Sequence, residues 1–147
     1  MVKVVVDLPA DTPERVLRLA AAVDEARALN LVILNVSKLT PVCSYFVICH
    51  GRSPVHAEAI AEKAREQAKA AGIRLHHREG SRRGEWIILD YMDVVVHIFS
   101  EEAREFYNLE RLWGDARRVN WVAAETAPDQ TAAGVENDEP VATSEPT

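Results

Sequence analysis

The sequence lacks the features that place a protein in a membrane or outside the cell. Its 147 residues contain no apolar run long enough to cross a bilayer. The first 16 residues have one run of three valines followed by acids and prolines, which is unlike a secretory signal. Only two cysteines are present, Cys43 and Cys49, too few for a disulfide framework. These absences predict a cytoplasmic protein with no membrane contact.

The C-terminal end lacks basic and aromatic residues. From residue 125 onward there are six acids, no Lys or Arg, no aromatic residue and two valines as the only large apolar side chains. Such a composition does not bury enough apolar surface to offset the entropy of ordering the chain. We therefore predict a disordered acidic tail at 124–147, after an N-terminal extension at 1–12 and one folded domain at 13–123.

The charges of the remaining sequence are balanced in number but separated along the chain. Residues 1–124 carry 17 bases and 17 acids, yet residues 52–83 have a net charge of +4 and residues 85–115 a net charge of −6. The acidic block is either a solvated face or a surface that docks on a basic partner.

The first half of the domain predicts alternating helices and strands. Apolar spacing predicts a helix from Thr12 to Asn30, with Thr12 as its cap and Pro13 at its first position. Short apolar runs at 31–36 and 44–50 are typical of buried strands. A second helix is expected at 54–72, with Ser53 as its cap and Gly72 as its left-handed end. A strand is expected to follow at 73–80.

The longest apolar stretch, "WIILDYMDVVVHIF" at 86–99, predicts a hairpin. Its even hydrophobicity favours strands at 86–89 and 94–99 that are buried on both faces, joined by a turn from Asp90 to Asp93. Ser100 is placed to cap a third helix at 101–116. The inner face of that helix is expected to hold Phe106, Leu109, Leu112 and Trp113. The fold class predicted from this order is α/β, with a mixed sheet of about five strands flanked by helices.

Three segments, "YFVICHGRS", "GEWIILDYMDVVVHIF" and "EEAREFYNLERLW", resemble the ribosomal silencing factor S family, also called the Iojap family. The resemblance covers roughly residues 13–121. It implies a nucleotidyltransferase-like fold without enzyme activity, cofactor or metal. It also implies binding to the large ribosomal subunit through its fourteenth protein, which blocks joining of the small subunit and represses translation when nutrients are scarce. Members also tend to form homodimers.

Three residues depart from the family pattern. Ser44 and Asn35 stand where the family usually has Asp, and Met92 stands where the hairpin turn normally has Gly. The first two changes remove carboxylates, which weakens any expectation of metal or nucleotide chemistry. The third makes the turn geometry a question, because glycine adopts a positive φ without steric cost.

The predicted partner-binding residues lie around the hairpin turn: Trp86, Asp90, Tyr91, Met92 and Asp93. The two carboxylates suit a basic ribosomal protein, while the apolar side chains supply contact area. From the sequence alone, core packing and an interface role are equally good interpretations of Trp86. The family resemblance implies that a Trp at this position contributes to the ribosomal-protein contact.

Alternative functions are less well supported by the sequence. A nucleotidyltransferase needs carboxylates that share one strand face, whereas Asp90 and Asp93 are three residues apart and no third acid is suitably placed. The cysteines do not have zinc-site spacing. A Cys49 nucleophile activated by His97 or His56 lacks an orienting group, and a hydrogen-bonded core histidine is the more common role for His97.

A minor contact with ribosomal RNA through Arg78, Arg82 and Arg83 is a further alternative. Three exposed arginines are common on protein surfaces, and no aromatic residue lies between these three.

Overall fold

The computed structural model describes residues 3–4, 12–80, 85–119 and 122–123. The chain divides into two compact units, one of residues 9–119 and one of residues 1–8 together with 120–147. In the second unit, β1 (Lys3–Val4) pairs with β8 (Val122–Ala123) in a short antiparallel ladder, which forms a two-stranded sheet of its own. The predicted disordered tail at 124–147 lies outside the described residues.

The larger unit is built on a six-stranded mixed sheet with the strand order β4-β5-β6-β3-β2-β7. Only β3 and β6 run parallel, and every other neighbouring pair is antiparallel. The strands are β2 (Leu29–Asn35), β3 (Tyr45–Gly51), β4 (His77–Gly80), β5 (Trp86–Asp90), β6 (Val94–Ser100) and β7 (Arg117–Val119). The predicted mixed α/β fold is confirmed, and β7 is a strand that the sequence pattern did not indicate.

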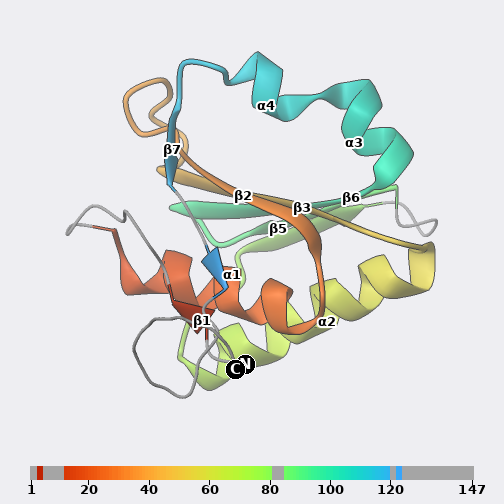
Figure 1. Cartoon of the computed structure of the whole chain (residues 1–147). Helices are drawn as coiled ribbons and strands as arrows, with labels where there is room; N and C mark the ends of the chain where they lie inside the picture. Colours follow the sequence, from red (N-terminus) through yellow and green to blue (C-terminus); the bar gives the residue numbers. More distant parts are fainter. Residues whose placement is uncertain (1–2, 5–11, 81–84, 120–121, 124–147) are drawn as a thin grey trace, which may run out of the picture. The chain divides into compact units, whose positions relative to one another are not determined.

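Helices cover both faces of this sheet, as Figure 1 shows. Helices α1 (Glu14–Glu25) and α2 (Pro54–Ala70) pack against each other and against one face. Helices α3 (Glu101–Tyr107) and α4 (Leu109–Leu112) lie over the other face. Since α2 follows β3 and α3 follows β6, the two parallel strands send their helices to opposite sides.

Three of the six predicted helix ends are present, namely both ends of α2 and the start of α3. Ser53 caps α2 by accepting a hydrogen bond from the backbone N–H of His56, and Gly72 follows the helix with a φ of +76°. Ser100 caps α3 by accepting from the N–H of Ala103. The prediction for α1 was wrong: Pro13 occupies the cap position and no side chain bonds to the helix start. Pro13 has an extended backbone there, with ψ 145°, so the helix begins one residue later than expected.

The third predicted helix is broken at Asn108. The backbone of Asn108 is left-handed, with a φ of +47°, which ends α3 and turns the chain into α4. The predicted inner face is therefore only half correct. Leu109 is buried and Trp113 is half-buried, but Phe106 is 82% exposed and Leu112 is 73% exposed.

The hairpin at 86–100 is confirmed, with β5 and β6 antiparallel and a short turn between them. A carboxylate oxygen of Asp90 accepts a 2.8 Å hydrogen bond from the N–H of Met92. Met92 has a φ of +77°, the conformation for which the family's glycine is suited. The expected burial on both faces was wrong for β5. Ile87 and Leu89 are fully buried, whereas Trp86, Ile88 and Asp90 alternate with them and are only half-buried.

The face under α1 and α2 is the closed side of the molecule. It is filled by aliphatic side chains without measurable exposure, drawn from both helices and four strands. Its members include Val16, Leu19, Val23, Ile33, Val47, Ile60, Ile87, Leu89, Val96 and Ile98. Burial of this kind supplies most of the stability of a small domain. The other face is less completely covered, and the candidate site lies there.

Candidate docking surface

The strand register brings outward-facing residues of β5, β6 and β3 together on the face that α3 and α4 cover. Trp86 pairs with Phe99, and His97 lies between Ile88 and Ile48 on the two flanking strands. Because alternate residues of a strand point to the same face, these side chains form one continuous surface. Ile88 and Trp86 are half-buried, so the helices leave part of this surface open.

Aromatic rings form a connected layer on this face. Six of the eight Phe, Tyr and Trp residues in the described part of the chain belong to it: Phe46, Trp86, Phe99, Phe106, Tyr107 and Trp113. The Trp86 ring centre lies 4.6 Å from that of Tyr107 and 4.9 Å from that of Phe99. Phe46 continues the layer toward Trp113 at 5.1 Å. Such contacts contribute about 0.5–1.5 kcal/mol per pair beyond the burial of area.

A hydrogen bond fixes the orientation of the Trp86 indole. Its Nε1–H donates to Nδ1 of His97 over 3.1 Å, and the His97 ring makes an edge contact with Phe46 at 4.7 Å. Burial lowers the pKa of His97 to about 4, so the ring is neutral at physiological pH and Nδ1 is available as an acceptor. His97 is therefore a hydrogen-bonded core histidine, as its sequence context favoured.

The turn residues predicted to bind a partner separate into two groups. Met92 is 59% exposed, and Asp90 is half-buried on the open side. Asp93 is half-buried and forms a 3.4 Å ion pair with Arg15 of α1, which partly neutralises its charge.

Tyr91 is fully buried, so its predicted contact with a partner has to be corrected. It continues the alternation of Ile87 and Leu89 and therefore points to the closed face.

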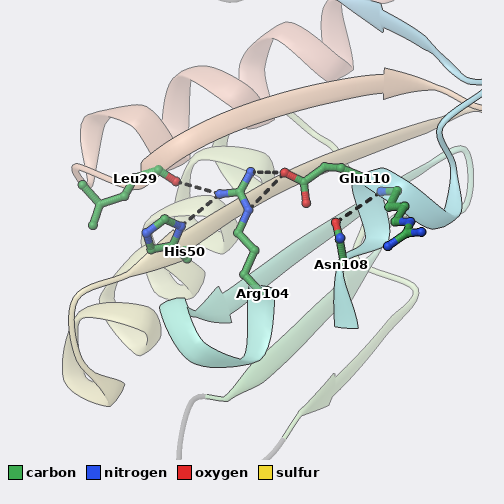
Figure 2. A network of polar contacts seen from close by, with 6 residues as sticks. Leu29, His50, Arg104, Asn108 and Glu110 are labelled. Atoms are coloured by element: carbon green, nitrogen blue, oxygen red, sulfur yellow. Dashed lines mark hydrogen bonds and ion pairs between the residues drawn. The ribbon is translucent and has the colours of Figure 1, made fainter. Parts of the chain in front are cut away.

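A buried arginine fastens α3 and α4 to the sheet, as Figure 2 shows. Arg104 donates from Nη1 to the carbonyl of Leu29 at 3.2 Å and to Nδ1 of His50 at 3.0 Å. Its Nη2 and Nε donate to one carboxylate oxygen of Glu110, at 2.8 and 3.3 Å. Burial and the Arg104 charge lower the pKa of His50, which keeps Nδ1 unprotonated as an acceptor.

This network holds the bend at Asn108 in place, and so determines where the exposed rings of α3 project. In the sequence, Arg104 is one of two bases within the acidic block at 85–115, and nothing local indicates this role, because His50 is 54 residues away.

Exposed apolar side chains and acids surround the open face. Phe106 and Leu112 are the most exposed apolar residues of α3 and α4, and Tyr107 is 48% exposed. Helix α3 carries three exposed acids, Glu101, Glu102 and Glu105, whereas Glu110 of α4 is half-buried and paired with Arg104. An apolar surface with an acidic rim is complementary to a partner that presents apolar residues among Lys and Arg. We refer to the combined area of Trp86, Ile88, Met92, Phe106 and Tyr107 as the docking surface.

The residues considered for catalysis are not arranged for it. Burial raises the pKa of Cys49 to about 12, so this thiol does not provide a thiolate nucleophile at neutral pH. Asp90 and Asp93 have separate partners, the N–H of Met92 and the guanidinium of Arg15. His56 is bonded to the N–H of Arg52 and to the carbonyl of Ala26.

The described residues offer no metal-binding group, no membrane-spanning helix and only one arginine of the alternative RNA contact. Over the described ranges, no three His, Cys, Asp or Glu residues are grouped to hold a metal ion. No helix in the same residues is long and apolar enough to span a bilayer. Arg78 forms a 2.7 Å ion pair with Glu58, while Arg82 and Arg83 lie outside the described residues.

Comparison with known proteins identifies the family. The sequence model described as "Ribosomal silencing factor during starvation" matches residues 9–145. The chain is 43% identical over 97 residues to "Ribosomal silencing factor RsfS" of Bacillus subtilis, a match that covers 66% of this chain and 82% of that protein. The chain therefore belongs to the ribosomal silencing factor family.

One solved structure and one more distant relative are also similar to this chain. A crystal structure of a Bacillus halodurans protein superposes with a TM-score of 0.64 at 37% identity, covering 74% of this chain and 99% of that one. The mouse protein "Mitochondrial assembly of ribosomal large subunit protein 1" is 28% identical over 126 residues, which are 82% of this chain and 55% of that protein.

Proposed function

We propose that the chain binds the large ribosomal subunit through its fourteenth protein and thereby blocks joining of the small subunit. The observation that carries the proposal is the half-open aromatic face centred on Trp86, whose indole is held in place before any partner arrives. A pre-oriented aromatic side chain loses little conformational entropy on binding, which favours affinity. The names of the relatives support a ribosomal target, and that of the mouse protein specifies the large subunit.

Inhibition in this proposal needs no chemistry. A domain bound where the small subunit must approach prevents joining by its volume alone, and translation is repressed when nutrients are scarce. The acids of α3 and the hairpin increase the association rate with a basic protein and select its orientation, while the aromatic residues supply affinity. Asp90 and Met92 remain in the proposed contact set with Trp86. Asp93 lies at its edge, and Tyr91 is replaced by Tyr107 and Phe106 of α3.

Free in the cytoplasm, the chain is expected to pair with a second copy through the same surface. Burying the exposed rings against each other removes apolar area from water in the absence of ribosomes. Sedimentation equilibrium across a range of concentrations measures this directly. A monomer at all concentrations would contradict the homodimer and leave the ribosomal proposal intact.

The decisive experiment is co-sedimentation of the full chain with purified large subunits. Trp86→Ala is expected to weaken binding at least about thirtyfold, since truncating a central Trp costs about 2 kcal/mol or more. Trp86→Phe keeps a ring in the stack but loses the bond to His97, and is expected to bind with intermediate affinity. Circular dichroism melting of each variant shows whether the domain is folded.

Two results would count against the proposal. A folded Trp86→Ala protein that binds large subunits as well as the parent removes Trp86 from the interface. Binding to large subunits without any binding to the purified fourteenth protein assigns the contact to another component.

A further inference from the structure

A pocket with a volume of about 420 Å³ lies between α2 and the segment that leads from α2 into β4. One wall is formed by Glu62, Arg65, Glu66 and Lys69 of α2. Ile73, Arg74 and Leu75 form the other wall, and Tyr91 contributes from the end of β5. None of these lining residues belongs to the docking surface.

The Tyr91 hydroxyl is an unsatisfied polar group at this pocket. The whole side chain is buried, and its hydroxyl has no hydrogen-bond partner. Burial raises the pKa of Tyr91 and the nearby Arg65 charge opposes that rise, so the hydroxyl is a neutral donor located near the Arg65 guanidinium. Buried hydroxyls normally have a partner, and one without a partner often indicates a bound water, ion or ligand.

The cations around this hydroxyl are largely free of other ion pairs. Lys69 and Arg74 have no ion pair among the residues that the structure describes. Arg65 approaches Glu62 at 3.7 Å, and both side chains are well exposed to solvent, so this pair is weak. Three cations and two carboxylates line the pocket, which leaves a net charge of +1. The three cations belong to the basic block at 52–83, which takes no part in the docking surface.

We propose that this pocket binds a phosphate group, supplied either by an RNA backbone or by a small phosphate compound. Arg65, Lys69 and Arg74 pair with its charge, and the Tyr91 hydroxyl donates to one of its oxygens once the flexible Arg65 side chain has moved outward. A phosphate satisfies this donor and the cations together, as charge-assisted hydrogen bonds do. The site stands independently of the proposed docking on a ribosomal protein.

The first test uses inorganic phosphate as the probe and the full chain. Thermal melting is compared in sodium phosphate and sodium chloride of equal ionic strength. Phosphate is expected to raise the melting temperature of the parent, because a ligand that binds only the native state stabilises it. Tyr91→Phe removes one hydroxyl and keeps the ring packing. It is expected to melt no lower than the parent in chloride and to lose most of the phosphate effect.

Tyr45→Phe is the matched control. Tyr45 is also buried, but its hydroxyl has a partner in Asn35 and it does not line the pocket. This variant is expected to retain the full phosphate effect. If phosphate does not stabilise the parent, or if it stabilises Tyr91→Phe equally, the proposal is overturned.

The second test identifies the source of the phosphate group. Binding of a fluorescein-labelled RNA oligonucleotide is followed by anisotropy for the parent and for Lys69→Gln combined with Arg74→Gln. Lys38→Gln combined with Lys63→Gln removes the same charge outside the pocket and serves as the control. If RNA is the source, Tyr91→Phe and the pocket double variant each weaken RNA binding about tenfold, while the control changes it little.

Each remaining outcome also decides the question. A phosphate effect that depends on Tyr91, with RNA binding unchanged in the pocket variants, assigns the site to a small phosphate compound. Equal weakening of RNA binding in both double variants, together with no effect of Tyr91→Phe in either assay, shows general charge attraction and overturns the proposal.

Discussion

The two faces of the sheet are built from different side chains and are covered to different extents. The face under α1 and α2 is mainly aliphatic, and residues such as Leu19, Ile60 and Leu89 have no measurable exposure to solvent. The face under α3 and α4 carries the aromatic layer. Two residues of β5 on this face, Trp86 and Ile88, remain half-buried. Neighbouring residues of β5 therefore belong to different environments, with Leu89 sealed and Ile88 partly open.

This difference separates stability from binding within one sheet. A closed aliphatic layer provides most of the folding free energy, because each fully buried side chain contributes about 1.5–3 kcal/mol. Because the closed face supplies this free energy, the domain remains folded although the helices cover the open face only in part. Exposed apolar area of this kind is typical of a surface that is covered by a partner. We expect substitutions on the closed face to affect melting, and those on the open face to affect association.

The largest expected effect comes from a pair of variants in β5. Leu89→Ala is expected to lower the free energy of unfolding by about 3 kcal/mol, because it leaves a cavity in the closed core. Ile88→Ala removes a similar side chain from the half-buried face and is expected to cost about 1 kcal/mol. Urea unfolding of both variants provides the comparison. Equal losses would show that the two faces contribute alike to stability.

A second prediction concerns pH and the histidine beneath Trp86. Burial lowers the pKa of His97 to about 4, whereas an unfolded histidine titrates near 6.5. The unfolded state therefore takes up the proton first as the pH falls. The stability contributed by neutral His97 is fully present above pH 6.5 and is lost between pH 6.5 and 4. At pH 5 the loss is about 2 kcal/mol.

His97→Phe is the variant that isolates this contribution. It is expected to be less stable than the parent at pH 7, because Trp86 loses its acceptor, but to lose much less stability between pH 7 and pH 5. His50 also has a lowered pKa and acts in the same direction, so part of the pH dependence remains. Urea unfolding at both pH values measures the difference. An identical fall in parent and variant would assign the pH dependence to other groups.

The parts of the fold that were predicted from the sequence are those encoded locally. Ser53, Gly72 and Ser100 have side chains or backbone preferences that define a helix end by themselves, and all three do so. The hairpin turn was found for the same reason, because Asp90 bonds to a backbone group two residues away. Met92 was correctly assigned to a position that suits glycine.

The parts that were missed depend on distant contacts or on a single backbone angle. The left-handed Asn108 turns Phe106 and Leu112 away from the sheet, and an uninterrupted helical pattern does not indicate such a break. The Arg104 network joins residues that are far apart in the sequence. The burial of Tyr91, by contrast, is encoded locally. The alternation of buried Ile87 and Leu89 predicts it if the strand pattern is continued one residue beyond Asp90.

A smaller effect is expected at the turn that ends the open face. Met92 holds a φ of +77°, which costs a residue with a side chain about 1 kcal/mol or more. Met92→Gly relieves this strain and removes a side chain that is 59% exposed, so it is expected to raise stability by about 1 kcal/mol. If the side chain contacts the partner, the same variant binds large subunits more weakly. A more stable variant with unchanged binding would remove Met92 from the docking surface.

The smallest stability change is expected from charges placed at two equally exposed apolar positions. Phe106 belongs to α3 and is 82% exposed, and Val55 belongs to α2 and is 80% exposed. The two helices lie on opposite faces of the sheet (Figure 1). Val55 has no aromatic contact to lose among the described residues, and Phe106 loses only its exposed edge contact with Tyr107, so Phe106→Asp and Val55→Asp are each expected to change the free energy of unfolding by about 0.5 kcal/mol. Their effects on association should differ. An Asp in place of Phe106 puts an unpaired carboxylate into the docking surface and is expected to weaken large-subunit binding at least about tenfold. Val55→Asp is expected to bind as the parent does. Co-sedimentation of both variants with large subunits measures the contrast. A greater loss of binding in Val55→Asp than in Phe106→Asp would place the docking surface on the α1 and α2 side.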